Sequence, residues 1–127
     1  MPVDILLTIS GEFVKAELND SDTAQEIIRN LPIEARFATW GDEIYFSLPM
    51  EKGEENAKEV VELGELGFWP PGNAFCIFYG ATPGSTPNRI MPASPVNPIG
   101  KVKGDPKVFK KLVKKSNRIR IEKAPIE

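Results

Sequence analysis

The sequence of 127 residues contains no histidine and one cysteine, Cys76. Without histidine, and with a lone thiol, the chain lacks the residues for a zinc site or a cysteine–histidine nucleophile. A disulfide within the chain is excluded, and the apolar neighbours of Cys76 in AFCIF predict a buried thiol rather than a reactive one. We therefore expect no metal site and a reducing, cytoplasmic setting.

Long hydrophobic runs and a strong net charge are also lacking. No apolar stretch approaches the roughly 18 residues that a membrane-spanning helix requires, and the N-terminal MPVDILLTIS has no basic region of a signal peptide. No phosphate-binding glycine motif precedes a predicted helix, so we expect no cofactor. The net charge of −2 and the 27% of charged residues are typical of a globular domain. We expect a single domain over residues 1–127 with no membrane partner.

Charge is nevertheless unevenly distributed along the chain. Residues 101–123 hold ten Lys or Arg residues against two acidic residues, a net charge of +8. The lysines of this segment fall on the outer face of a predicted helix whose inner face is formed by Phe109, Leu112 and Val113. We interpret the lysines as a solvated helix face, in preference to an RNA- or phosphate-binding surface, and expect no nucleic-acid partner.

Alternation of apolar and polar residues predicts short strands along most of the chain. VDILLTIS and FVKAEL form a predicted hairpin, EARFATW and EIYFSL a second one about Gly41-Asp42, and AFCIF a buried central strand. Thr23 and Glu26 form a capping-box pattern that starts a first helix, and Asp105-Pro106 starts a second helix that ends near Ser116. This order predicts a mainly β fold: a closed antiparallel β-barrel of about eight strands with two capping helices.

Two longer connections separate these elements. The acidic segment after Pro49 predicts a solvated loop, and Val60 and Val61 then resume extended structure. The segment from Gly80 to Pro98 carries five prolines. Such a connection is either a structured functional loop or a cover over one end of the barrel.

Three segments resemble the cyclophilin fold. VDILLTISGEFVKAELND is similar to its first hairpin, GELGFWPPGNAFCIFYG to the segment that turns through a corner into a Phe-rich strand, and VNPIGKVKGDPKVFKKLVKKSNRIRIEKA to its closing helix and strand. The resemblance covers nearly the whole chain. The sequence looks most like the compact, functionally uncharacterised prokaryotic proteins with a cyclophilin-like fold.

The resemblance implies a prolyl-isomerase site whose residues are mostly replaced. Val96 stands where cyclophilins carry histidine, and Met91 stands near their tryptophan. Asp42 and Glu43 replace a Phe-Met pair, and Tyr45 replaces a glutamine. Arg36 is the candidate catalytic arginine, although the alignment through Gly41 places Phe37 at that position. Since a slip of one residue reverses the face of a strand, Arg36 points either into the groove or away from it.

The candidate ligand-binding residues are Arg36, Tyr45, Trp69, Asn73 and Phe75. Trp69 either stacks on a ligand or covers the barrel mouth, and Asn73 also suits a left-handed turn. We favour a binding domain without standard isomerase chemistry, which holds a peptide or small molecule in a groove walled by Trp69, the 80–98 loop and the third strand. The alternative is a divergent peptidyl-prolyl isomerase that uses Arg36. Whether the protein is an enzyme, and its oligomeric state, stay open at this point.

Overall fold

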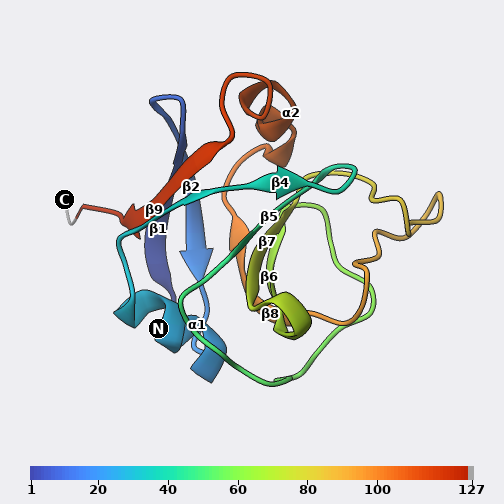
Figure 1. Cartoon of the computed structure of the whole chain (residues 1–127), viewed down its shortest axis with the longest axis horizontal. Coiled ribbons are helices and arrows are strands. Elements are labelled where there is room, and N and C mark those ends of the chain that lie inside the picture. The colour runs from blue at the N-terminus through green and yellow to red at the C-terminus, as the bar shows by residue number, and fades with distance from the viewer. Residues whose placement is uncertain (126–127) are drawn as a thin grey trace.

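The computed structural model describes residues 1–125, which form a nearly closed antiparallel β-barrel (Figure 1). Its nine strands lie in the order β3-β9-β1-β2-β8-β6-β7-β5-β4. The strands are β1 (Val3–Ile9), β2 (Glu12–Leu18), β3 (Ile33–Arg36), β4 (Ala38–Thr39), β5 (Glu43–Ser47), β6 (Glu65–Trp69), β7 (Ala74–Phe78), β8 (Asn97–Val102) and β9 (Arg118–Lys123). The edge strands β3 and β4 are separated in the chain by Phe37 alone, so the chain itself joins the two edges of the sheet. The predicted mainly β barrel with two helices is confirmed, with nine strands where about eight were expected.

Alternate residues of the strands fill the barrel interior. On β1 the side chains of Ile5, Leu7 and Ile9 are fully buried. The turn from β1 to β2 passes through Ser10 and Gly11, whose φ angles of 54° and 79° match the left-handed conformations of a two-residue hairpin turn. The opening hairpin is therefore confirmed.

Two helices lie at opposite ends of the barrel (Figure 1). The helix α1 spans Asp22–Arg29, and α2 spans Phe109–Leu112 after the 3₁₀ turn η2 (Pro106–Val108). Both helices contribute to the barrel core, through Ala24 and Ile27 of α1 and through Phe109 and Leu112 of α2. The second helix is shorter than predicted, because its first turn adopts the tighter 3₁₀ geometry and the N–H groups of residues 114 and 115 also donate to the carbonyl three residues earlier.

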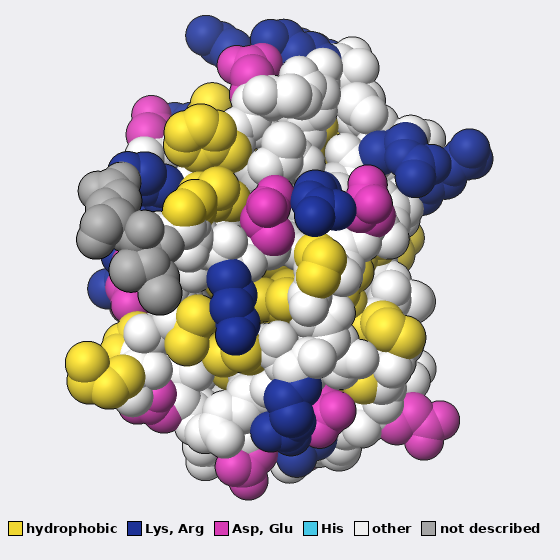
Figure 2. All heavy atoms as spheres, turned by 90° about the vertical axis from the view of Figure 1, so that its left-hand side faces the viewer, with side chains coloured by type: hydrophobic (Ala, Val, Ile, Leu, Met, Phe, Trp, Pro, Cys, Tyr) yellow, Lys and Arg dark blue, Asp and Glu magenta, His cyan; other side chains and the backbone are white. Residues whose placement is uncertain are grey.

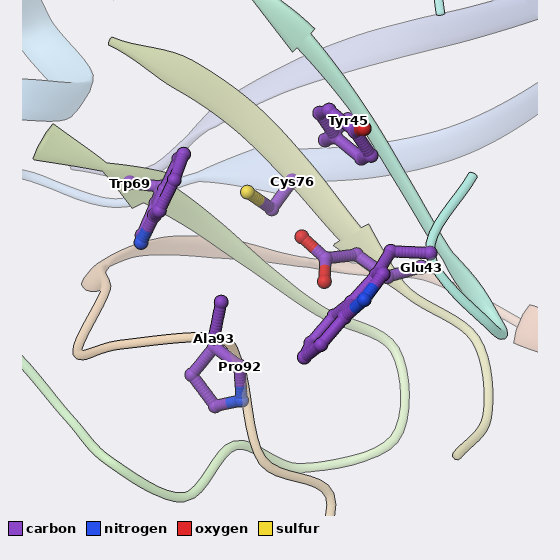
Figure 3. A pocket seen from close by; sticks show the side chains of 7 residues that line it. Glu43, Tyr45, Trp69, Cys76, Pro92 and Ala93 are labelled. Carbon is purple, nitrogen blue, oxygen red and sulfur yellow. The ribbon is translucent and has the colours of Figure 1, made fainter. Parts of the chain in front are cut away.

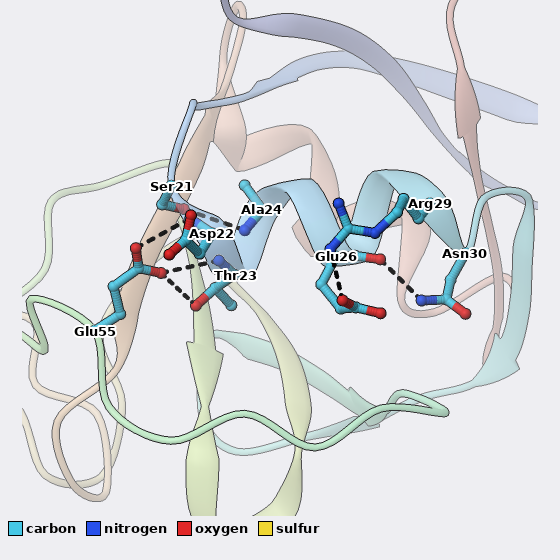
Figure 4. A network of polar contacts seen from close by, with 8 residues as sticks. All are labelled: Ser21, Asp22, Thr23, Ala24, Glu26, Arg29, Asn30 and Glu55. Atoms are coloured by element: carbon cyan, nitrogen blue, oxygen red, sulfur yellow. Dashed lines mark hydrogen bonds and ion pairs between the residues drawn. The ribbon is translucent and has the colours of Figure 1, made fainter.

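The start of α1 differs from the predicted capping box (Figure 4). Ser21 is the N-cap and accepts a hydrogen bond of 3.1 Å from the backbone N–H of Ala24. Thr23 lies inside the first turn, where its N–H and hydroxyl both donate to Oε1 of Glu55, at 2.9 and 2.6 Å. The Asp22 N–H donates to Oε2 of the same carboxylate at 3.0 Å. These hydrogen bonds, led by that of the Thr23 hydroxyl, lower the pKa of Glu55, so the predicted solvated loop is tied to the helix at this residue.

Strand β7 is buried on both faces. Phe75 and Ile77 point into the main barrel core. Cys76 and Phe78 point outward into a second apolar cluster, which also contains Val61, Ala74 and Val96. All five residues of β7 are buried, which confirms the prediction of a central strand around Cys76.

The second apolar cluster is covered by two segments, residues 57–61 and 80–96. Two isolated β-bridges, Lys58 with Val96 and Val61 with Ile90, hold the segments together. The extended structure predicted at Val60 and Val61 is thus present as an isolated bridge at Val61 rather than as a full strand. The proline-rich connection covers the barrel wall, because its residues Ile90 and Val96 pack in the same apolar cluster as the outward side chains of β7.

Five of the ten basic residues of the C-terminal segment form ion pairs with acidic residues from the rest of the chain. Ion pairs join Lys103 to Asp4 at 2.6 Å and Lys115 to Glu12 at 2.6 Å. Further pairs are Lys101–Glu17, Lys110–Asp42 and Arg120–Glu34. On the face shown in Figure 2, basic and acidic side chains are intermingled with apolar ones. This pairing agrees with the interpretation of the segment as a solvated surface.

Candidate functional site

A small pocket lies on the outer wall of the barrel, where β5, β6 and β7 are adjacent (Figure 3). In the strand register Tyr45 lies opposite Cys76, which in turn lies opposite Gly67. Because alternate residues of a strand share a face, Glu43 lies on the same outward face as Tyr45. The cavity has a volume of about 220 Å³ and is lined by Trp40, Glu43, Tyr45, Trp69, Cys76, Pro92 and Ala93.

A glycine on β6 brings the covering segment close to the sheet. A Cβ atom added to Gly67 would lie 2.9 Å from Cγ2 of Val96, a distance that packed side chains do not tolerate. The absence of a side chain therefore allows Val96 to rest directly on β6. The residues just before Val96, Pro92 and Ala93, then form one wall of the pocket.

Hydrogen bonds fix this wall and its neighbour Trp69. The indole Nε1 of Trp69 donates to the hydroxyl of Ser94 at 2.6 Å. Further back in the connection, the Ser85 hydroxyl accepts from the N–H groups of Thr82 at 2.9 Å and Met91 at 3.1 Å. The Thr82 hydroxyl donates to the carbonyl of Met91. The loop that covers the pocket is thus held by its own polar side chains, which gives the cavity a preformed shape.

Glu43 places a buried carboxyl in this otherwise apolar cavity. Its side chain comes from the start of β5, and Figure 3 shows the carboxyl directed into the pocket beside the Cys76 thiol. The residue is only 6% exposed. Burial raises the pKa of Glu43 to about 7, while the neighbouring Cys76 thiol acts in the opposite direction. Near neutral pH this carboxyl is therefore able to hold or release a proton.

The chemistry of Cys76 is that of a protonated thiol. Burial raises its pKa well above the ordinary value, and the neighbouring charge of Glu43 raises it further. A thiol in this state is a poor nucleophile, as the sequence predicted. The pocket thus offers a carboxyl as its reactive acid–base group.

Asp42 and Glu43, adjacent in the chain, occupy different surroundings. The Asp42 carboxylate lies 3.6 Å from Nζ of Lys110 on α2, and it is not among the pocket residues. It does face Tyr79, whose pKa is raised to about 12 by burial and by the Asp42 charge. Asp42 and Glu43, which the resemblance placed together in the proline-binding site, are therefore separated: Glu43 lines the pocket and Asp42 does not.

The structure brings together two of the five predicted ligand-binding residues. Tyr45 and Trp69 line the pocket. Phe75 is fully buried in the barrel core, and Asn73 forms the left-handed end of the 3₁₀ turn η1 (Pro70–Gly72), with a φ angle of 49°. Arg36 is exposed on β3, where it lies opposite Arg118 of β9, and does not line the cavity.

Glu43 and Trp40 line the pocket but were not among the predicted ligand-binding residues. The signal for Glu43 was present, since it precedes Tyr45 by two residues and so shares its face. Trp40 lies in the turn before β5, and its contribution depends on the fold of the 80–96 connection. Its indole approaches Gly84, where an added Cβ would lie 3.4 Å from Cη2. Such a contact between distant segments has no local sequence signal.

Metal-binding clusters and membrane-spanning helices are both absent from residues 1–125. Within that part of the chain no group of three or more Cys, Asp or Glu side chains is placed to hold a metal ion. In the same residues no helix combines the length and apolarity needed to cross a membrane.

The fold and the site define a β-barrel domain with a small preformed pocket on its outer wall. The chain belongs to the Cyclophilin-like family, whose model matches residues 1–122. It is also similar to the solution structure of a hypothetical protein from Archaeoglobus fulgidus, with 33% identity, a TM-score of 0.73, and coverage of 97% of this chain and 95% of that chain. Curated proteins gave no match. The suspected relationship to uncharacterised cyclophilin-like proteins is thus confirmed.

Proposed function

We propose that the protein is a binding domain that holds a small organic molecule, or one side chain of a peptide, in the pocket formed by β5, β6, β7 and the 80–96 connection. The observation that carries the proposal is the Glu43 carboxyl, buried and directed into an apolar, aromatic cavity. Concave apolar sites with few polar groups are typical of ligand sites, and a buried acid with a raised pKa supports such an assignment.

The residues of the pocket do not support standard prolyl-isomerase chemistry. The described residues that line it include no arginine, and Arg36 lies on β3 in a pair with β9. A shared fold does not by itself carry the activity of other members of a family. We therefore favour ligand binding over the divergent isomerase.

Ligand binding can be tested by filling the pocket. Ala93 is an exposed residue in the pocket wall, so Ala93→Phe should place a ring in the cavity with little effect on the barrel. Ala81→Phe, at an exposed loop position that does not line the cavity, is the matched control. In NMR spectra, a mixture of small aromatic and aliphatic fragments should shift the indole N–H signals of Trp40 and Trp69 in the wild type and the control. Ala93→Phe should abolish the shifts, and wild-type spectra that no fragment changes would contradict the proposal.

The isomerase alternative has a direct assay. We expect the protein to leave the cis–trans exchange rate of a proline-containing peptide unchanged. Acceleration of this exchange by the wild type, and its loss in Arg36→Ala, would reverse our preference.

A further inference from the structure

The pocket wall combines aromatic rings with one acid. Trp40, Tyr45 and Trp69 contribute three aromatic side chains, and Glu43 contributes the carboxyl. The faces of aromatic rings carry partial negative charge and attract cations, most strongly for tryptophan. No lysine or arginine of the described chain lines the cavity. The wall therefore favours a positive ligand over an anion.

Glu43 also lacks a basic partner. Other acids form ion pairs, as Asp42 does with Lys110 and Glu65 with Lys58. Within residues 1–125 Glu43 takes part in no ion pair, and no basic side chain is among the causes that shift its pKa. The neighbouring Cys76 thiol donates to the Ala74 carbonyl at 3.8 Å. A carboxylate that is more than nine-tenths buried without a counter-ion is unfavourable. A bound cation would supply the missing charge.

The other residues that line the pocket favour an organic cation over a metal ion. Cys76, Pro92 and Ala93 offer apolar surface, whereas a hard metal ion requires several oxygen ligands. A cation with alkyl groups on its nitrogen satisfies both the carboxylate and the apolar wall. The volume of about 220 Å³ lies below the roughly 300–1,000 Å³ of typical drug-sized sites, which indicates a small ion or a single side chain.

We propose that the pocket binds an alkylated ammonium ion, with the Glu43 carboxylate as its counter-ion and the rings of Trp40, Tyr45 and Trp69 around its alkyl groups. This inference rests on the proposed function, because it names the ligand class of the same pocket. The ammonium group belongs either to a free small molecule or to a methylated lysine side chain, and these sources share the same chemistry.

Binding should be linked to a proton. Glu43 has a pKa of about 7 without ligand. The other titratable residues that line the pocket are Cys76 of β7, whose thiol is next to the carboxyl, and Tyr45 of the same strand as Glu43. At pH 7 about half of the Glu43 carboxyl groups are protonated. Because a cation binds the ionised carboxylate, its binding at this pH releases protons from Glu43. The ionised fraction rises about tenfold between pH 6 and pH 8, so the affinity should rise by about the same factor.

Isothermal titration calorimetry with two probes of matched shape tests the proposal. Choline carries a trimethylammonium group, and 3,3-dimethylbutan-1-ol replaces its nitrogen by carbon without charge. For the wild type at pH 8 we expect choline to bind at least tenfold more tightly than the alcohol. We also expect the affinity for choline to be about tenfold higher at pH 8 than at pH 6. A peptide with one trimethyllysine, compared with choline, identifies the source of the ammonium group.

Variants locate the effect in the pocket. Glu43→Gln should reduce the preference for choline to the part that the aromatic rings supply and should abolish its pH dependence, whereas Glu59→Gln, at an exposed position, should keep both. Trp40→Leu retains apolar volume and removes the ring, so it should weaken choline binding about threefold or more with little change for the alcohol.

The alternatives give different results. Equal affinity for choline and the alcohol, or choline binding that Glu43→Gln leaves unchanged, overturns the ammonium inference while the pocket stays a ligand site. Absence of choline binding at pH 8 overturns the inference as well. If the fragment mixture also fails to shift the indole signals of the wild type, the proposed function falls with it.

Discussion

At the scale of single residues, Glu43 is the unusual feature of this protein. A glutamate at a buried position of a strand is normally costly unless it is paired or protonated. Here the pKa is raised from 4.5 to about 7, so between these pH values the folded protein holds a proton that the unfolded chain does not. The folded state is therefore stabilised relative to the unfolded state as the pH falls from about 7 toward 4.5, and the full cost of ionisation is present above pH 7.

Replacement of Glu43 by glutamine should reveal this cost. Between pH 5 and pH 8, the free energy of unfolding of Glu43→Gln relative to the wild type should rise by about 2 kcal/mol, because glutamine has no charge to bury. Urea denaturation at both pH values measures the change. Glu59→Gln, at an exposed position, should show no such pH-dependent difference. A constant difference for Glu43→Gln would mean that the carboxyl is not desolvated.

At the scale of elements, the pocket depends on contacts between β6 and the covering segment. Gly67 permits the close approach of Val96, and the indole N–H of Trp69 donates a hydrogen bond to the Ser94 hydroxyl. Tyr45 was a candidate because it stands where cyclophilins carry a glutamine, and Trp69 because an aromatic ring before Pro70-Pro71 either stacks on a ligand or covers the barrel mouth. It could not predict Trp40, Pro92 or Ala93, since their place depends on how a connection rich in proline folds over a distant strand.

A double-mutant cycle tests the contact between β6 and the cover. Gly67→Ala should destabilise the protein by about 1–3 kcal/mol, because the added Cβ collides with Val96. Val96→Ala removes the colliding methyl group, so the double variant should lose about 1 kcal/mol less than the sum of the single variants. Urea denaturation of the four proteins measures this coupling. Additive losses of stability in the two single variants would show that the covering segment moves away from the added Cβ without strain.

The start of α1 gives a second test at this scale. Glu55→Gln should destabilise the protein by about 1–2 kcal/mol, because a charged acceptor for the first backbone N–H groups of the helix is lost. Amide hydrogen exchange at Thr23 should become faster. The neighbouring Glu54 is exposed, and Glu54→Gln serves as the control with no expected change.

At the scale of the whole molecule, the barrel was predictable because its strands carry regular alternation and its central strand is continuously apolar. Helix ends were predicted less well. Beside the N-cap Ser21, the first turn of α1 has a second acceptor in Glu55, more than 30 residues further along the chain, and local capping patterns contain no such information. Arg36 shows the same limit, because its face depends on the pairing of β3 with β9.

The junction of β3 and β4 at Phe37, where the two edges of the sheet are joined, is the seam of the barrel and offers a test of its closure. Phe37 is 8% exposed and lies where the chain passes from β3 to β4. Phe37→Ala should reduce the free energy of unfolding by about 3 kcal/mol or more. Phe13, which is 59% exposed on β2, provides the matched control, and Phe13→Ala should change stability by about 0.5 kcal/mol or less. Equal effects of the two substitutions in urea denaturation would contradict a packed seam.

The direct passage from β3 to β4 has a consequence for behaviour at high concentration. The two edge strands are four and two residues long, and they meet at the seam, so little unpaired backbone is offered to a neighbouring molecule. Long free edges are templates for intermolecular strand addition and aggregation. A protein arranged in this way should stay dispersed in crowded solution without a dedicated protective segment.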